Sequence, residues 1–400
     1  MRILFITNSI PFPILGGASL RNYNLLRRLA VEHEVRLAAF AKNAEQIEAV
    51  QHMKQFCKSV DFVEAGEQSA LSDFPNFIRY VLNGIPPDMR LNTSNELIHL
   101  IQQRLSQFQF DVIHIDQLHM GLYLGIVPPD QQHKTLWSLH DVDFVRYKRI
   151  IQLEPKKTRK IRLWFNNQFL YHWEPRFAAK FGRCITVSEL DKQLLLDENP
   201  ALKIEVIPNG VDTVSFASGP EVQERHALIF VGNMGYLPCI DAINYFCGQI
   251  LPMIRQAVPD VEFWVVGRDP PESIKRLNGN GIHVTGRVQD VRPFYEQSTV
   301  CVVPLRAGGG TRLKILEAMA TGRPVISTSI GCEGLNLVDN EQILIADDPA
   351  SFAQKSIELL TNPSLRKQIS TNSRRFMESC YDWSVIVERL IEVYQQVAAS

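Results

Sequence analysis

The stretch from Gly308 to Thr328 reads GGGTRLKILEAMATGRPVIST and predicts three connected elements. A glycine-rich turn comes first, a helix with apolar periodicity follows, and Gly322, Arg323 and Pro324 lead into a short apolar strand. A glycine turn that opens a helix leaves unpaired backbone N–H groups at the positive end of the helix dipole. Such a turn is a ready site for a phosphate group.

Three charged residues lie in or just before the expected helix. Arg312 and Lys314 fall in its first turn, where cations are unfavourable unless an anion neutralises them. Glu317 follows on the same helix, and a carboxylate can accept two hydrogen bonds from a vicinal diol such as a ribose. The alternative is an ordinary loop and an amphipathic helix whose solvated face carries these charges, because a glycine cluster alone does not decide between the two.

Length and composition indicate a soluble globular protein. The chain has 400 residues, enough for two or more domains, with 45% hydrophobic and 21% charged residues. A net charge of −1 argues against nucleic-acid binding through bulk charge. The 7 cysteines include no CxxC pair, so we expect reduced thiols rather than disulfides or zinc. The apolar run at the N-terminus is too short for a signal peptide, and we expect a cytoplasmic protein without a membrane span.

Strand-like and helical patterns alternate along the chain, which predicts an α/β fold with parallel sheets. Short apolar runs mark the strands: 2–9, 34–41, 111–116, 134–141 and 184–189, then 227–234, 261–269, 282–288, 300–305 and 343–348. The pattern restarts at KIEVIPNGVD, so we place a boundary near Pro208–Pro220. The prediction is two doubly wound, Rossmann-like domains, 1–207 and 208–380, followed by a C-terminal helix in 381–400.

Ligands of doubly wound sheets bind at the carboxyl ends of the strands. Six loops lie at such ends: Gly16–Gly17, His140–Asp141, Gly232–Asn233, Gly267–Arg268, Gly286–Val288 and Gly308–Arg312. We expect the strand ends of the two domains to face a cleft, which favours a ligand-binding role for the glycine turn. A nicotinamide dinucleotide is disfavoured, because no GxGxxG follows the first strand and no acidic residue ends the second.

Five motifs in order carry a resemblance to a known family: TVSE (186–189), VIPNGVD (206–212), FVGNM (230–234), HVTGRVQDV (283–291) and LKILEAMATGRPVIST (313–328). Together they resemble the GT-B glycosyltransferases of group 1, or family 4, over nearly the whole chain. The tail WSVIVERLIEVYQQV resembles the helix that crosses back onto the N-terminal domain in this fold. GGGTRLKILEAMA followed by GCEGL resembles an exopolysaccharide-type branch.

The resemblance implies a retaining transferase that moves a sugar from a UDP- or GDP-linked donor to a glycan or lipid-linked acceptor, without a cofactor or a protein-bound metal. Glu317 matches the glutamate that holds the donor ribose, and Val288 matches the position that reads the base. The turn at Gly310, Thr311, Leu313 and Lys314 matches the turn that holds the diphosphate.

The resemblance also implies roles for the N-terminal domain. Gly16 and Gly17 match a loop that closes over phosphate and acceptor, and His140 matches a histidine near the transferred sugar. On the residues alone, His140 could also be a satisfied core histidine, and Asp141 and Asp143 could be either helix caps or catalytic groups.

Two departures from the family pattern affect the donor site. Gly309 stands where the family has a second glutamate, and the loop GNMGYLPCID, which contains Asn233, lacks the usual Arg and Lys. Because a diphosphate leaving group must be neutralised, our hypothesis is that Arg312 and Lys314, with Arg268, supply the charge.

Two further patterns in the sequence have a possible functional interpretation. His114, Asp116 and His119 suggest a metal site, but alternation places only His114 and Asp116 on one strand face and a partner cluster is lacking, so no metal is predicted. The run 147–165 mixes bases with Ile, Leu, Trp and Phe. It describes either a solvated helix face or a patch for peripheral contact with an anionic membrane, which would suit a lipid-linked acceptor.

Two other functions remain open on the sequence. One is a sugar-nucleotide epimerase of the same fold, which would convert the donor alone. The other is a non-catalytic protein that binds a nucleotide sugar, a reading that Gly309 makes credible.

Overall fold

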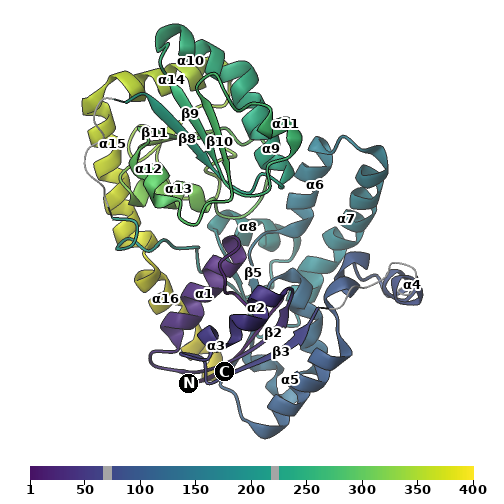
Figure 1. The fold of residues 1–400 in the computed structure, drawn as a ribbon. Helices are drawn as coiled ribbons and strands as arrows, with labels where there is room; N and C mark the ends of the chain where they lie inside the picture. The colour runs from purple at the N-terminus through teal and green to yellow at the C-terminus, as the bar shows by residue number, and fades with distance from the viewer. Residues whose placement is uncertain (66–73, 218–224) are drawn as a thin grey trace. The chain divides into compact units, whose positions relative to one another are not determined.

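The computed structural model describes residues 1–65, 74–217 and 225–400 (Figure 1). The chain divides into two compact units. The N-terminal unit comprises Met1–Ile151, Lys156–Pro208 and Ile386–Ser400, and the C-terminal unit comprises Gln152–Pro155 and Asn209–Val385. Of the expected boundary region, residues 218–220 lie outside the described part of the chain.

The N-terminal unit is built on a parallel seven-stranded sheet in the order β3-β2-β1-β4-β5-β6-β7. Its strands are β1 (Arg2–Thr7), β2 (Glu34–Ala41), β3 (Ser59–Glu64), β4 (Val112–Asp116), β5 (Thr135–Leu139), β6 (Arg183–Thr186) and β7 (Ile204–Val206). β4 and β5 are buried along their whole length, as expected for a parallel sheet covered on both faces. β3 was not predicted. β7 pairs with β6, so the strand at which the pattern was expected to restart instead completes the first sheet.

Helices connect these strands and cover the sheet. They are α1 (Gly17–Leu29), α2 (Ala44–Glu48), α3 (Val50–Met53), α4 (Phe74–Leu82), α5 (Asn95–Gln107), α6 (Asp143–Leu153), α7 (Lys157–Ala178), α8 (Glu189–Glu198) and the 3₁₀ segments η1 (Pro87–Asn92), η2 (Leu118–Ile126) and η3 (Pro129–Lys134). The final helix, α16 (Trp383–Ala398), places residues 386–400 in this unit, and Tyr394 hydrogen-bonds to His114 of β4.

The C-terminal unit is built on a parallel six-stranded sheet in the order β10-β9-β8-β11-β12-β13. Its strands are β8 (Ala227–Val231), β9 (Glu262–Val266), β10 (Ile282–Gly286), β11 (Val300–Val303), β12 (Val325–Ser327) and β13 (Leu344–Ile345). Its helices are α9 (Leu237–Tyr245), α10 (Leu251–Ala257), α11 (Glu272–Lys275), α12 (Arg292–Glu296), α13 (Leu313–Ala320), α14 (Pro349–Thr361) and α15 (Pro363–Phe376), with π segments η4 (Phe246–Ile250) and η5 (Met377–Tyr381). The predicted fold class, two Rossmann-like parallel sheets with helices, is confirmed.

One helical stretch within the described residues, Leu237–Ala257, is long and apolar enough to cross a membrane by length and composition. Its buried side chains, among them Ile243, Phe246 and Ile254, belong to the core of the C-terminal unit. Packing in that core accounts for its apolar composition.

Each sheet has one point at which the strand order reverses. In the N-terminal sheet it lies between β1 and β4, and in the C-terminal sheet between β8 and β11. Connections leave these adjacent strands in opposite directions, so a crevice opens at their carboxyl ends, where doubly wound proteins bind ligands.

Candidate functional site

The glycine turn of the C-terminal unit follows β11 and opens α13, as predicted from the sequence. Gly308 and Gly310 have φ values of 127° and 65°, which favour glycine. A Cβ on Gly308 would also lie only 3.2 Å from the Arg312 guanidinium. The turn therefore needs glycine for its backbone, and α13 begins directly after it, at Leu313.

Arg312 stabilises this turn. The buried guanidinium donates from Nη1 to the carbonyls of Gly309 and Gly310, and from Nη2 to that of Ile330 at 3.4 Å. The neutralisation of a diphosphate by Arg312 stays a prediction, because these bonds already give its side chain a structural role.

Lys314 extends from α13 toward the end of β8. Its Nζ lies 3.7 Å from the centroid of the Phe230 ring and 3.0 Å from the point where a Cβ on Gly232 would stand. Burial lowers the pKa of the ammonium group. Burial therefore disfavours the charged form of this amine at the reversal point between β8 and β11, and an incoming anion would favour it.

Glu317 lies one turn further along α13 and is fixed by a tyrosine that sequence reasoning did not identify. The hydroxyl of Tyr295 is 3.1 Å from Glu317 Oε2 and 3.2 Å from the carbonyl oxygen of Lys314. Burial raises the pKa of Glu317 to about 7, although the Tyr295 hydrogen bond and the Lys314 charge act in the opposite direction. A carboxylate held in this way is positioned to accept hydrogen bonds from a diol.

The other predicted donor residues lie at the ends of neighbouring strands. Asn233 follows β8, Arg268 follows β9 and Val288 follows β10, next to one another in the sheet. Backbone hydrogen bonds join these loops, from Met234 N to Arg268 O and from Gly267 N to Gly286 O. Because β11 is the next strand, the sheet brings all four predicted loops to one edge.

Close approach of two of these loops depends on Gly267. It has a φ of 145°, and a Cβ there would lie 1.7 Å from the carbonyl oxygen of Gly232.

Two predicted donor residues lack a strong partner in the structure described. The Arg268 side chain is 37% exposed, and its Nε lies 3.6 Å from an Asp269 carboxylate oxygen. In the glycine turn, the Thr311 hydroxyl is buried and has no hydrogen-bond partner among the described residues. An unpaired buried hydroxyl is costly, and a ligand oxygen would satisfy it.

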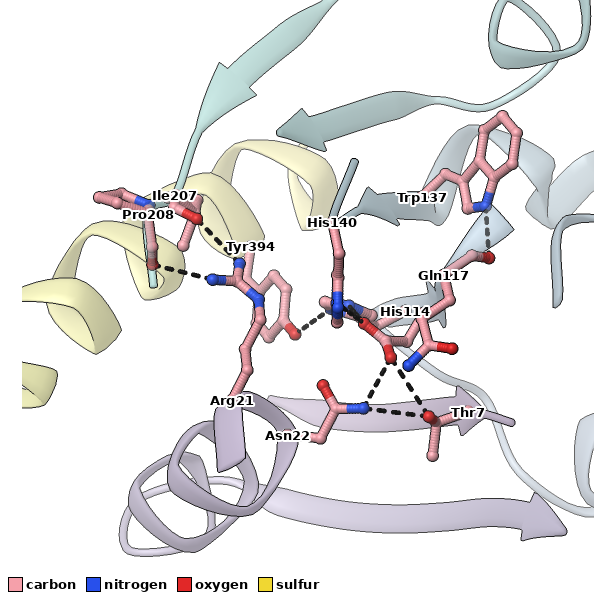
Figure 2. Close-up of polar contacts among 11 residues, drawn as sticks. Thr7, Arg21, Asn22, His114, Gln117, Trp137, His140, Ile207, Pro208 and Tyr394 are labelled. Carbon is pink, nitrogen blue, oxygen red and sulfur yellow. Dashed lines mark hydrogen bonds and ion pairs between the residues drawn. The ribbon is translucent and has the colours of Figure 1, made fainter. Parts of the chain in front are cut away.

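The N-terminal unit gathers a second set of polar residues at its own reversal point, around Asp116 at the end of β4. Figure 2 shows Thr7, Asn22 and His140 of this set. The fully buried carboxylate of Asp116 accepts hydrogen bonds from Asn22 Nδ2 at 2.6 Å, from the Thr7 hydroxyl at 3.2 Å and from His140 Nε2 at 2.8 Å. Thr7 ends β1, Asn22 lies on α1 and His140 directly follows β5. Asp116 holds the predicted residue His140 and is itself held by Thr7 of β1 and Asn22 of α1.

Charge balance explains why Asp116 can be buried. Burial alone would raise its pKa, but the His140 charge and hydrogen bonds from His114 and His140 bring that pKa well below its usual range. Because an ionised carboxylate only accepts hydrogen bonds, His140 carries a proton on Nε2 and leaves Nδ1 for a ligand. His114 lies 3.8 Å from Asp116, and its Nδ1 is 2.6 Å from the Tyr394 hydroxyl.

A buried arginine completes this cluster. Arg21 on α1 is 1% exposed, and burial lowers its pKa to about 10 while the charge of Asp116 opposes that change. Its guanidinium donates to the carbonyls of Pro208 and Ile207 at 2.8 and 2.9 Å (Figure 2). Gly16 and Gly17 precede these residues, and α1 begins at Gly17. The predicted loop and His140 are therefore connected through Asn22 and Asp116.

Sequence reasoning missed five members of these clusters: Thr7, Arg21, Asn22, Tyr295 and Tyr394. For Asp116 the available sequence signal is its place at the end of a strand, on the same face as His114. Asp143 begins α6 and pairs with Arg146, as a residue of a helix terminus. Within the described residues, three or more His, Cys, Asp or Glu side chains are nowhere grouped to hold a metal ion.

Comparisons with known proteins bear on both units. Residues 15–215, half of the chain, match the family model described as "Glycosyltransferase Family 4", and residues 225–362 match "Glycosyl transferases group 1". A Klebsiella pneumoniae protein described as "Uncharacterized 44.6 kDa protein in cps region" is 23% identical, with 95% of this chain and 96% of that protein covered. The phosphatidyl-myo-inositol mannosyltransferase of Mycobacterium leprae is 24% identical, with 78% and 80% covered.

Solved structures share the fold. Sucrose-phosphate synthase from Thermosynechococcus elongatus superposes with a TM-score of 0.75 at 17% identity, covering 100% of both chains. Anabaena HepE, solved with UDP and glucose, gives a TM-score of 0.66 at 16% identity, covering 99% of this chain and 100% of that one. These likenesses establish the GT-B fold of the chain. With the two family models, they identify the chain as a member of glycosyltransferase family 4, among the group 1 glycosyltransferases.

Proposed function

We propose that this glycosyltransferase is a retaining, metal-independent enzyme that uses a UDP- or GDP-linked sugar to glycosylate a hydroxyl group in glycolipid or polysaccharide assembly, at a cytoplasmic site. The observation that carries the proposal is the geometry of one turn. Glu317, Lys314 and the unpaired hydroxyl of Thr311 lie together where the strand order of the C-terminal sheet reverses. The Glu317 carboxylate can accept hydrogen bonds from a ribose diol, the Lys314 amine can carry a positive charge, and the Thr311 hydroxyl can donate a hydrogen bond to a phosphate. These are the groups that binding of a nucleoside diphosphate requires.

Each group has a distinct task in the proposed reaction. Glu317 holds the ribose, and Val288 provides backbone contact for the base. The charge that develops on the leaving diphosphate is stabilised by Lys314 and by the N-terminus of α13. Front-side attack by the acceptor hydroxyl on the anomeric carbon needs no protein nucleophile, because the departing phosphate oxygen can take the proton of the acceptor.

The N-terminal unit contributes His140, which the family resemblance assigns to the transferred sugar. Its Nδ1 is free for a sugar hydroxyl because Asp116 holds the opposite ring nitrogen. Relatives support the acceptor class, since the Mycobacterium leprae relative is described as a phosphatidyl-myo-inositol mannosyltransferase.

One observation favours a second function, non-catalytic binding of a nucleotide sugar. Gly309 offers no carboxylate where the family has a glutamate that contacts the sugar. A protein of this kind would bind the donor through the same turn and would leave it unchanged.

The experiment is NMR of UDP-glucose, UDP-N-acetylglucosamine and GDP-mannose incubated with the protein, with and without a lipid or glycan extract. The proposal expects donor consumption that depends on the extract, a product with the anomeric configuration of the donor, and loss of turnover in Glu317→Ala. Conversion of the donor alone to its epimer would contradict it, and so would a product of inverted configuration. Donor binding without turnover with any extract would instead establish the non-catalytic alternative.

A further inference from the structure

Helix α7 of the N-terminal unit is apolar on two opposite faces. Leu163, Leu170 and Trp173 are buried, as expected for a helix packed on its own unit. Ile161, Trp164 and Phe165 are 66%, 55% and 38% exposed. Their spacing of three and four residues places them on a single stripe of the helix surface. The stripe belongs to the run 147–165, whose residues on α6 are mostly half-buried.

Positive charge surrounds this stripe. Lys157, Lys160 and Arg162 are exposed on the same two turns. The one acidic residue of α7, Glu174, is fully buried, and its carboxylate accepts from the backbone N–H groups of Asp143 and Phe144 at the start of α6. An acid reaches the helix from α8, where Glu198 accepts a hydrogen bond from the Tyr171 hydroxyl at 2.9 Å.

The stripe continues into a cavity of about 810 Å³ beside the second half of α7. Phe165 contacts Phe169, with ring centroids 5.2 Å apart, and Phe169 lines the cavity. Trp173 and Phe177, stacked with ring centroids 4.2 Å apart, line it together with Ile85.

Two basic side chains are among the residues that line the cavity. Arg176 and Lys180 line it, with Lys180 Nζ 5.2 Å from the Phe177 ring. Leu82 at the end of α4 is 80% exposed and directly precedes the cavity-lining Asn83. α4 and α7 of this unit can be followed in Figure 1. A cavity of this volume, mostly apolar with a few convergent charges, is typical of a small-molecule site.

We propose that α7 and the end of α4 dock this protein on an anionic phospholipid bilayer, and that the cavity takes up one anionic lipid. Ile161, Trp164 and Phe165 enter the interfacial layer. The acyl chain of the bound lipid lies against Phe169, Trp173 and Phe177, and its phosphate is held by Arg176 and Lys180. None of these residues belongs to the proposed donor site, so the two proposals stand or fall separately.

The chemistry of the surface selects a bilayer as the occupant. A helix that lies in the interfacial plane needs an apolar stripe with flanking bases, and tryptophan is favoured at that depth. Each base near an anionic surface adds about fivefold to the membrane partition coefficient. A cavity that opens beside the stripe would receive a lipid without removing its headgroup from the interface.

The test is co-sedimentation of the full chain with phosphatidylcholine vesicles, with or without phosphatidylglycerol. We expect binding that requires phosphatidylglycerol, a blue shift of Trp164 fluorescence, and a loss of about 100-fold in partition coefficient for Lys157→Gln/Lys160→Gln/Arg162→Gln, at about fivefold per base. The control Lys58→Gln/Arg276→Gln/Lys367→Gln removes three exposed charges elsewhere and should bind like the wild type.

Lipid uptake is tested in a Trp164→Phe background with phosphatidylglycerol brominated on its acyl chains. Contact with Trp173 predicts quenching, and Arg176→Gln/Lys180→Gln should abolish it while nucleotide-induced stabilisation stays unchanged. The proposal is overturned if binding ignores phosphatidylglycerol, or if both charge variants bind alike. It is also overturned if brominated lipid leaves tryptophan emission unchanged in the Trp164→Phe variant, or if an acidic soluble protein binds the stripe and vesicles do not.

Discussion

Glu317→Gln isolates the charge of the proposed ribose ligand. The glutamine can still accept a hydrogen bond from Tyr295, so the substitution removes the ionisation and keeps the contact. Burial raises the pKa of Glu317 from 4.5 to about 7 in the folded protein. Between these values the folded state keeps a proton that the unfolded state has lost, so the wild type loses stability as the pH rises from 4.5 to 7.

The magnitude follows from the same values. At about 1.4 kcal/mol for each pH unit, ionisation of Glu317 costs the folded state about 3 kcal/mol above pH 7 and almost nothing below pH 4.5. Glu317→Gln should therefore gain stability relative to the wild type as the pH rises through this window, and the difference should level off above it. Urea unfolding at pH 5, 6, 7 and 8, followed by tryptophan fluorescence, measures that difference.

Donor binding should show the opposite dependence. Only the ionised carboxylate accepts two hydrogen bonds from a diol, so the affinity of the wild type for a nucleoside diphosphate, relative to that of Glu317→Gln, should rise up to about pH 7 and then level off. Titration of the ligand's own phosphate affects both proteins alike and cancels in this ratio. Calorimetric titration over the same pH range provides the comparison. Parallel stability curves for the two proteins would refute the reasoning, because Glu317 would then titrate as an ordinary exposed carboxylate.

Three further substitutions test individual contacts. Lys314→Met should weaken nucleoside diphosphate binding by about 10- to 100-fold, the value of a charge-assisted hydrogen bond, whereas Lys367→Met on the exposed face of α15 should not; equal calorimetric affinities would contradict this. Asp116→Asn should lower turnover about tenfold or more and leave nucleotide affinity unchanged. Without the carboxylate, the proton of the His140 ring should no longer be fixed on Nε2, which ¹⁵N NMR spectra would show. An unchanged tautomer would contradict a positioning role for Asp116. Gly267→Ala should cost about 3 kcal/mol or more of stability in urea and abolish nucleotide binding, because its Cβ would meet the Gly232 carbonyl, whereas Gly248→Ala, with open space around it, should be tolerated.

The local structure of Gly308–Thr328 could be predicted because its signals are local. The glycines, the apolar periodicity and Pro324 indicate a turn, a helix and a strand, and the structure confirms α13 and β12. The structural role of Arg312 could not be predicted. Its bonds to the Gly309 and Gly310 carbonyls depend on a backbone path through two positive φ values, which sequence spacing does not encode.

The cluster around Asp116 shows a different limit. Strand alternation correctly placed His114 and Asp116 on one face of β4, but their partners lie far away in the sequence. His140 and Thr7 meet Asp116 only because β4 is inserted between β1 and β5, and Tyr394 arrives from the last helix. β3 was missed because its short alternating pattern, SVDFVE, is half polar and less buried than those of its neighbours.

The central claim is that the turn before α13 binds the nucleoside diphosphate of a sugar donor. Thermal unfolding of the wild type and Glu317→Ala with UDP, GDP, ADP and their sugars tests it most directly. A ligand at about 100 times its Kd should stabilise the wild type by about 2.7 kcal/mol. We predict stabilisation by one nucleotide family, lost in Glu317→Ala. Absence of stabilisation by every nucleotide, or equal stabilisation of both proteins, would contradict the claim.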